Sequence, residues 1–140
     1  YWHKPEATAE ALTADCWLRT GDVVTLDEDG FATIVDRLKE IIITGGFNVS
    51  PSEVERVLRQ HPAVENVAVV GVKQERGDEQ IVAAVVPNST VDEAEVRAWA
   101  KERLSAYKVP RRVVTVDELP TSMIGKVLRG QVRDQIKPLL

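Results

Sequence analysis

The chain has 140 residues, enough for one domain or for one domain with a short appendage. Hydrophobic residues make up 44% of it and aromatic residues only 5%, so a core must be built mainly from Val, Ile, Leu and Ala. No apolar run approaches the roughly 20 residues that span a bilayer, and no signal-peptide pattern opens the sequence. The net charge of −4, without a basic stripe interleaved with aromatics, argues against a nucleic-acid partner. We therefore expect a soluble intracellular protein.

The lone Cys16 cannot form an internal disulfide, and no Cys/His cluster has metal-ligand spacing, so we expect no metal site. Cys16 itself should be a small packing residue. Charge is uneven along the chain: residues 103–137 carry eight basic and three acidic side chains, so this stretch is +5 and the remainder −9. Such a field suits a phosphate-bearing ligand, and solvated surface charges explain it equally well.

The first predicted element is a β-hairpin over residues 23–35. Residues 23–26 and 31–35 are rich in strand formers, and Asp27-Glu28-Asp29-Gly30 between them supplies turn chemistry. Residues 1–14 show neither a clear two-residue nor a clear 3.6-residue period.

The three isoleucines at 41–43 predict a short buried strand, which Gly45-Gly46 ends by freeing the backbone. A helix should follow, because Ser50 can cap it, Pro51 fits its first position, and Glu53 completes a Ser-x-x-Glu capping box. Its apolar stripe consists of Val54, Val57 and Leu58.

This helix should end at His61-Pro62. Two strands are predicted next, at 64–72 and 80–86, and the loop 73–78 between them favours an antiparallel pair. A second helix begins near Asp92. Its apolar face comprises Val96, Trp99, Ala100 and Leu104.

The second helix should end before Tyr107, and residues 112–116 predict another strand. A last helix is expected after Gly125, with Leu128, Val132 and Ile136 at four-residue spacing. Strands and helices do not alternate strictly. We therefore predict an α+β fold: a short antiparallel sheet packed with about three helices, preceded by the hairpin.

Two signatures carry the functional information. The first runs from Gly30 through Asp36-Arg37-x-Lys39-Glu40 into Thr44-Gly45-Gly46-Phe47-Asn48-Val49; the second is Pro120-Thr121-Ser122-x-x-Gly125-Lys126. The second is not a P-loop, because it lacks the first Gly and the Ser/Thr after Lys. In their order and spacing the two signatures resemble the C-terminal portion of the adenylate-forming superfamily: acyl- and aryl-CoA ligases, firefly-type luciferases and peptide-synthetase adenylation domains.

The resemblance implies a division of the chain. Residues 1–38 correspond to the last piece of a large N-terminal AMP-binding domain, Lys39 to the hinge, and residues 40–140 to the small mobile C-terminal domain. A hinge needs backbone freedom, and a long polar side chain can stay solvated in both states, so Lys39 is expected to be a pivot and not a catalyst.

The resemblance also implies roles in nucleotide chemistry. Lys126 corresponds to the lysine that contacts the substrate carboxylate and the α-phosphate during adenylation, where an ammonium stabilises phosphoryl charge. Asp22, in Trp17-x-Arg19-Thr20-Gly21-Asp22, corresponds to the carboxylate that binds the ATP ribose hydroxyls. Arg37 corresponds to an arginine that contacts ribose or phosphates. From the residues alone, these three would be a turn lysine, a turn aspartate and a surface ion pair.

The loop Gly45-Gly46-Phe47 is implied to line the channel for the pantetheine arm of CoA, although Gly-Gly before a helix is also ordinary loop sequence. Weaker candidates for the CoA phosphates are Lys108, Arg111, Arg112 and Arg129.

The implied activity is that of an ATP-dependent acid–thiol ligase, most like bacterial fatty-acyl-CoA ligases, with CoA as co-substrate and with ATP and Mg²⁺ held mainly by the missing N-terminal domain. The implied parent is a cytoplasmic protein, and peripheral association with the membrane is compatible with the resemblance. The fragment alone should be nearly inactive. Two alternatives stay open: an adenylation domain serving a carrier protein, and a binding module without chemistry.

Overall fold

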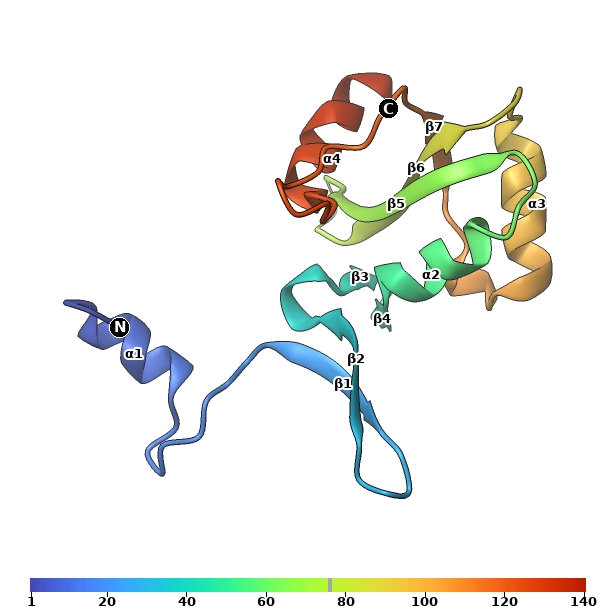
Figure 1. Cartoon of the computed structure of the whole chain (residues 1–140). Helices are drawn as coiled ribbons and strands as arrows, with labels where there is room; N and C mark the ends of the chain where they lie inside the picture. The colour runs from blue at the N-terminus through green and yellow to red at the C-terminus, as the bar shows by residue number, and fades with distance from the viewer. Residues whose placement is uncertain (76) are drawn as a thin grey trace. The chain divides into compact units, whose positions relative to one another are not determined.

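The computed structural model describes residues 1–75 and 77–140; Arg76, in the loop expected at 73–78, lies outside the described residues. The backbone divides into two compact units, Tyr1–Lys39 and Glu40–Leu140 (Figure 1). Within the part of the chain that the structure describes, no helix is both long enough and apolar enough to cross a membrane.

The first unit contains a short helix and a hairpin. Strands β1 (Asp22–Leu26) and β2 (Ala32–Arg37) pair antiparallel around the turn predicted from the sequence. The Asp27 carboxylate secures this turn by accepting the Phe31 N–H at 2.8 Å. Helix α1 (Pro5–Ala11) was not expected; its seven residues bury no side chain, so they show no apolar period.

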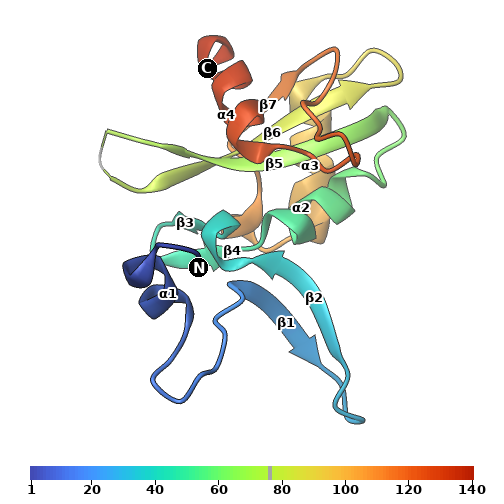
Figure 2. The same cartoon turned by 60° about the vertical axis from the view of Figure 1, so that its left-hand side comes forward.

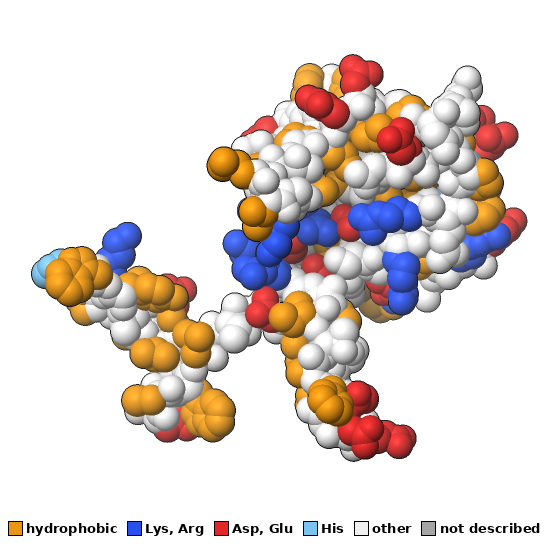
Figure 3. Space-filling model, in the orientation of Figure 1, with side chains coloured by type: hydrophobic (Ala, Val, Ile, Leu, Met, Phe, Trp, Pro, Cys, Tyr) orange, Lys and Arg blue, Asp and Glu red, His pale blue; other side chains and the backbone are white. Residues whose placement is uncertain are grey.

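Large apolar side chains lie on the surface of this first unit, where Figure 3 shows them in orange. Trp2 is 87% exposed and Trp17 is 73% exposed. The expectation for Cys16 was wrong: its side chain is exposed and its φ is +67°, because it lies in the turn that leads back from Thr13 to Trp17 and not in a core.

The second unit holds most of the ordered elements. Along the chain these are β3 (Ile42–Thr44), β4 (Phe47–Val49), α2 (Pro51–Leu58), β5 (Val64–Lys73), β6 (Glu79–Pro87), α3 (Glu93–Arg103), β7 (Arg112–Thr115) and α4 (Arg129–Ile136). Single turns of 3₁₀ helix occur at Leu38–Glu40, where the two units join, at Ala106–Lys108 and at Lys137–Leu139.

The main sheet has the strand order β5-β6-β7. The predicted antiparallel pairing of β5 with β6 is confirmed. The pairing of β6 with β7 is parallel, because the chain between them crosses over through α3 and not through a tight turn. The α+β class with a small sheet and packed helices is confirmed.

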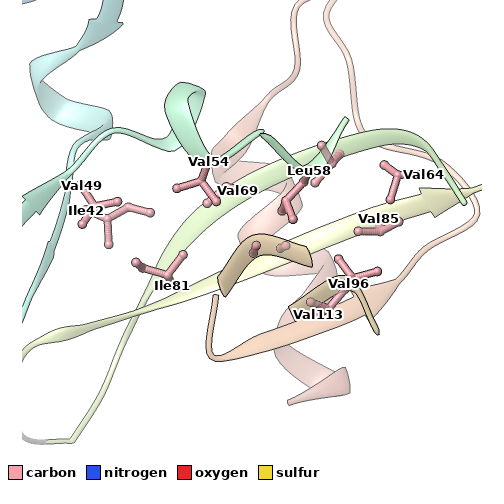
Figure 4. Close-up of a cluster of buried hydrophobic side chains, with 13 residues drawn as sticks. Ile42, Val49, Val54, Leu58, Val64, Val69, Ile81, Val85, Val96 and Val113 are labelled. Atoms are coloured by element: carbon pink, nitrogen blue, oxygen red, sulfur yellow. The ribbon is translucent and has the colours of Figure 1, made fainter. Parts of the chain in front are cut away.

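Both faces of this sheet are covered (Figure 2). Side chains alternate between the faces along each strand, so Val67, Val69, Ile81, Ala83 and Val85 share one core with α2 and α3. Figure 4 shows Val54 and Leu58 of α2 in this core with Val96 of α3. On the opposite face, Ala68, Val70, Val82, Ala84 and Val114 of the sheet pack with Val132 and Ile136 of α4.

Helix α2 begins as predicted, with the Ser50 hydroxyl accepting the Glu53 N–H at 3.3 Å. It ends at Leu58, earlier than His61-Pro62, and a short turn follows. The strand predicted at 41–43 is only partly buried: Ile42 is 1% exposed and Ile43 is 57% exposed. Residues 42–44 form one arm of a small hairpin with β4, which the sequence did not predict, so only one face of the arm meets the core.

Candidate functional site

Lys126 lies on a loop that is closed at its base. The Leu128 N–H donates to the Pro120 carbonyl at 2.8 Å, and Thr121 and Val127 form an isolated antiparallel bridge above it. Within the loop, the Ser122 N–H donates to the Lys126 carbonyl at 2.7 Å and the Lys126 N–H donates to Ser122 Oγ at 3.1 Å. The backbone is therefore fixed at Lys126, while its side chain is exposed and has no partner among the described residues.

The tip of this loop requires a glycine and presents apolar side chains. Gly125 has a φ of +76°, in the left-handed region that other residues rarely adopt. Met123 is 106% exposed and Ile124 is 77% exposed. Such a tip offers both a cation and apolar surface to whatever it contacts.

Asp22 and Arg37 are brought together in the first unit. They are directly opposed residues of β1 and β2, and Arg37 Nε lies 3.4 Å from Asp22 Oδ1. The Asp22 side chain is 17% exposed and its Oδ1 accepts no hydrogen bond within the described residues, whereas the Arg37 side chain is 54% exposed. Asp22 Oδ1 is itself buried, so the pair presents a solvent-facing guanidinium beside a largely covered carboxylate that has an unused acceptor.

Lys39 is the last residue of the first unit, and its side chain is exposed. It sits in the 3₁₀ turn Leu38–Glu40, so the backbone changes direction at this position. Glu40 begins the second unit and forms an ion pair with Arg129.

The Gly45-Gly46 turn joins β3 to β4, with φ of +54° and +80°. Beyond it, the Phe47 ring stacks on Tyr107 with centroids 4.4 Å apart and planes 20° from parallel. A hollow of about 180 Å³ lies against this pair; its lining includes Thr44, Gly45, Phe47, Asp78, Ile81, Tyr107 and Arg111. An aromatic wall beside exposed glycine backbone can accept a slim, partly apolar chain.

A second hollow, of about 530 Å³, adjoins the first, because Thr44, Asp78 and Arg111 line both. Its lining also contains Glu75 and Glu79 and is polar. Arg111 is therefore a basic residue that lines both hollows.

The four weaker basic candidates differ in their pairing. Arg112 pairs with Glu93 at 3.3 Å, Lys108 with Glu53 at 2.7 Å, and Arg129 with Glu40 and Glu55. Arg111 has no side-chain partner among the described residues. It is thus the member of this group with a guanidinium free for an added anion. Figure 3 shows basic side chains beside acidic ones on one face of the second unit.

The Lys108–Glu53 pair gives a stability prediction. The hydrogen bond that Lys108 donates to the Glu53 carboxylate raises the pKa of Lys108 above its ordinary value of 10.5, and the Lys108 side chain is 20% exposed. Because the folded pKa is raised, the stabilisation is complete below the ordinary pKa and is lost as pH rises through the raised value. Chemical denaturation should therefore show that the free energy of unfolding falls above about pH 10.5. In Glu53→Gln this fall should be smaller by on the order of 1 kcal/mol. An equal reduction by Glu102→Gln, which removes an exposed surface pair, would contradict this assignment.

Sequence reasoning missed the Phe47–Tyr107 stack and the orientation of Arg111. The two aromatics are 60 positions apart, and no local spacing signals their contact. Among the described residues, no group of three or more His, Cys, Asp or Glu side chains could hold a metal ion.

Comparison with known proteins gives the family. The family model described as "AMP-binding enzyme C-terminal domain" matches residues 53–126. The crystal structure of ATP-bound MatB from Rhodopseudomonas palustris matches with a TM-score of 0.92 at 37% identity, covering 99% of this chain and 28% of that one.

Curated relatives match along nearly the whole chain. A feruloyl-CoA synthase from Amycolatopsis is 50% identical over 95% of this chain and 27% of its own length. A long-chain-fatty-acid–CoA ligase from Escherichia coli O157:H7 is 43% identical over 98% of this chain and 24% of its own length. The chain therefore spans about a quarter of these relatives, and it belongs to the C-terminal domain family of the AMP-binding, adenylate-forming enzymes.

Proposed function

We propose that this chain is the C-terminal portion of an acyl-CoA ligase. In the first step, a carboxylate oxygen attacks the α-phosphorus of ATP and pyrophosphate leaves, which gives acyl-AMP. In the second step, the CoA sulfur attacks the acyl carbonyl carbon and AMP leaves, which gives the thioester. What supports this is the family, together with relatives that are CoA ligases and synthases.

Lys126 is the residue proposed to act in the first step. Its exposed ammonium, on a loop with a hydrogen-bonded backbone, would meet the charge that gathers on the phosphoryl oxygens. Because it stabilises charge and transfers no proton, it needs only to be cationic and correctly placed. The exposed Lys126 ammonium on this hydrogen-bonded loop is the single observation on which the proposed adenylation chemistry rests.

Asp22 and Arg37 are proposed to bind the nucleotide. The Asp22 carboxylate would accept hydrogen bonds from the ribose hydroxyls, and Arg37 beside it would contact the ribose or a phosphate. The Mg²⁺ that accompanies ATP is proposed to be held by residues of the parent outside this chain.

The second step is proposed to follow a rotation at Lys39, after which the hollow beside Gly45, Gly46 and Phe47 receives the pantetheine arm. Arg111, unpaired within the described residues, is the basic side chain proposed to contact a CoA phosphate, and it shares the lining of the larger hollow with Glu75, Asp78 and Glu79.

Phe47→Ala tests this channel. It removes one wall of the hollow, yet Phe47 is 52% exposed, so the fold should survive. In the parent we expect thioester formation from supplied acyl-AMP to slow by roughly 10-fold and adenylation to change by less than about 2-fold. Phe31→Ala, which truncates an exposed phenylalanine of the first unit, is the control. Equal slowing of both steps would exclude Phe47 from the channel.

The acid substrate is proposed to be a fatty acid. An aromatic acid is the second candidate, since the feruloyl-CoA synthase shares 50% identity with the chain against 43% for the long-chain ligase. The deciding experiment uses the chain within its full-length parent: ATP-dependent pyrophosphate release with fatty acids of increasing length and with hydroxycinnamic acids, with acyl-CoA measured in parallel. Release without transfer to CoA would point to another acceptor, such as a carrier-protein thiol.

The isolated chain is proposed to have little activity, because it supplies only part of each half-site. Repeated turnover of acyl-CoA by these 140 residues alone would refute this division of labour.

A further inference from the structure

Arg129, the first residue of α4, follows Lys126 by three positions and reaches two carboxylates from distant parts of the chain. Its Nη1 lies 2.5 Å from Glu40 Oε2, and its Nη2 lies 2.9 and 3.0 Å from the two oxygens of Glu55. The Arg129 side chain is only 19% exposed. One planar guanidinium therefore joins the start of the second unit, helix α2 and the end of the Lys126 loop.

Glu55 is a fixed anchor for this guanidinium. Its side chain is 5% exposed, its Oε1 accepts the Val69 N–H of β5 at 2.9 Å, and its Oε2 lies 3.3 Å from Arg59 Nη2. Arg59 in turn donates to the Val67 carbonyl at 3.3 Å. The Glu55 carboxylate is thus bonded to the Val69 N–H and to Arg59 as well as to Arg129. Because these contacts fix Glu55, they also hold Arg129 in place relative to the sheet.

Glu40 is the second carboxylate that Arg129 binds, and it lies beside the expected hinge. It is the first residue after Lys39, and its side chain is 27% exposed. At the other end, Arg129 directly follows Leu128, whose N–H closes the base of the loop on Pro120. Helix α4 has no side-chain cap at its N-terminus, so the Arg129 contacts take part in fixing where this terminus lies.

We propose that Arg129 is a positioning residue: by binding Glu40 and Glu55 at once, it fixes the Lys126 loop relative to the segment that leaves Lys39. The inference rests on the proposed roles of Lys126 and Lys39. A rotation about one residue delivers a distant lysine accurately only if the connection between pivot and loop is stiff. A misplacement of about 1 Å is enough to cost roughly 100-fold in rate.

Hydrogen exchange on this chain tests the mechanical part without any activity. Glu40→Gln removes one carboxylate charge and leaves Glu55 intact, so the fold should persist. We expect the Ser122 and Leu128 amides to exchange at least about 3-fold faster than in the wild type. The matched control is Glu93→Gln, which breaks the 3.3 Å ion pair with Arg112 elsewhere in the second unit and should leave these amides unchanged. Unchanged exchange in Glu40→Gln would overturn the proposal.

The catalytic part is tested in the full-length parent with Glu40→Gln, Lys126→Ala and the double variant. We expect Glu40→Gln to slow adenylation by roughly 10-fold, to leave thioester formation within about 2-fold, and to have no further effect in the Lys126→Ala background. A positioning role predicts this non-additivity, and a general structural role does not. Equal losses in both steps, or additive losses with Lys126→Ala, would overturn the proposal.

Rates of Lys126→Ala and Glu40→Gln distinguish the proposed function of Lys126 from the positioning role of Arg129. An adenylation rate that Lys126→Ala leaves unchanged would refute the proposed function of Lys126, and with it a positioning role toward that lysine. A rate that falls with Lys126→Ala but not with Glu40→Gln would leave the proposed function standing and refute the role of Arg129.

Discussion

In the full-length parent, Lys126→Ala is expected to slow acyl-adenylate formation by roughly 100-fold or more, the usual consequence of losing one preorganised group that stabilises transition-state charge. The loop should persist, because its hydrogen bonds involve backbone groups and the Ser122 hydroxyl and not the lysine ammonium. Pyrophosphate release under single-turnover conditions measures this step.

Thioester formation from supplied acyl-AMP should be largely spared, because the proposed rotation takes Lys126 away for that step. Lys137→Ala is the control: it removes another exposed lysine, one that pairs with Asp134 at the far end of α4. Equal losses in both half-reactions would make Lys126 a structural residue.

The largest expected effect on stability is that of Glu55→Ala. It would leave the mostly buried Arg129 without its anchor, deprive Arg59 of its carboxylate partner and leave the Val69 N–H without an acceptor. Breaking one partner out of a buried ionic network typically costs about 3–5 kcal/mol, and we expect a loss of that order in the free energy of unfolding. Denaturant unfolding of this chain measures it.

Glu102→Ala provides the comparison for Glu55. Glu102 also forms an ion pair, with Arg103 at 2.9 Å, but its side chain is 72% exposed. A surface pair of this kind contributes about 1 kcal/mol or less. Similar losses for the two variants would mean that Glu55 acts as a surface charge and not as an anchor.

Local signals predicted most of the second unit. The capping residues Ser50 and Asp92 marked the starts of α2 and α3, since each side chain accepts a backbone N–H of its helix. The apolar spacing of Val132 and Ile136 placed α4 in the core. These features depend on neighbouring residues, which is why the sequence alone sufficed.

The remaining features depend on contacts between distant residues. No local pattern says that β7 lies parallel to β6, because the pairing follows from the crossover through α3. The exposure of Ile43 depends on its pairing with Asn48 in a hairpin, and it contradicts what three consecutive isoleucines indicate.

In the candidate site, too, local sequence predicted some features and contacts between distant residues determine the others. The signatures pointed to Lys126 and Gly45-Gly46 as residues, but not to the closed base of the loop or to the aromatic stack beside the glycines. The sequence indicated Arg129 only as a candidate phosphate contact. Its pairing with Glu40 spans 89 positions, a distance that no spacing rule covers.

The side chains around Glu55 have one more consequence, for solubility. Strand β5 lies at the edge of its sheet, where free backbone groups can recruit a strand from another molecule. Here Arg59 binds the Val67 carbonyl, Glu55 the Val69 N–H and Arg133 the Gly71 carbonyl, at every second residue along the strand. Charged side chains thus occupy the positions that a neighbouring strand would take, which makes this edge a poor template for aggregation.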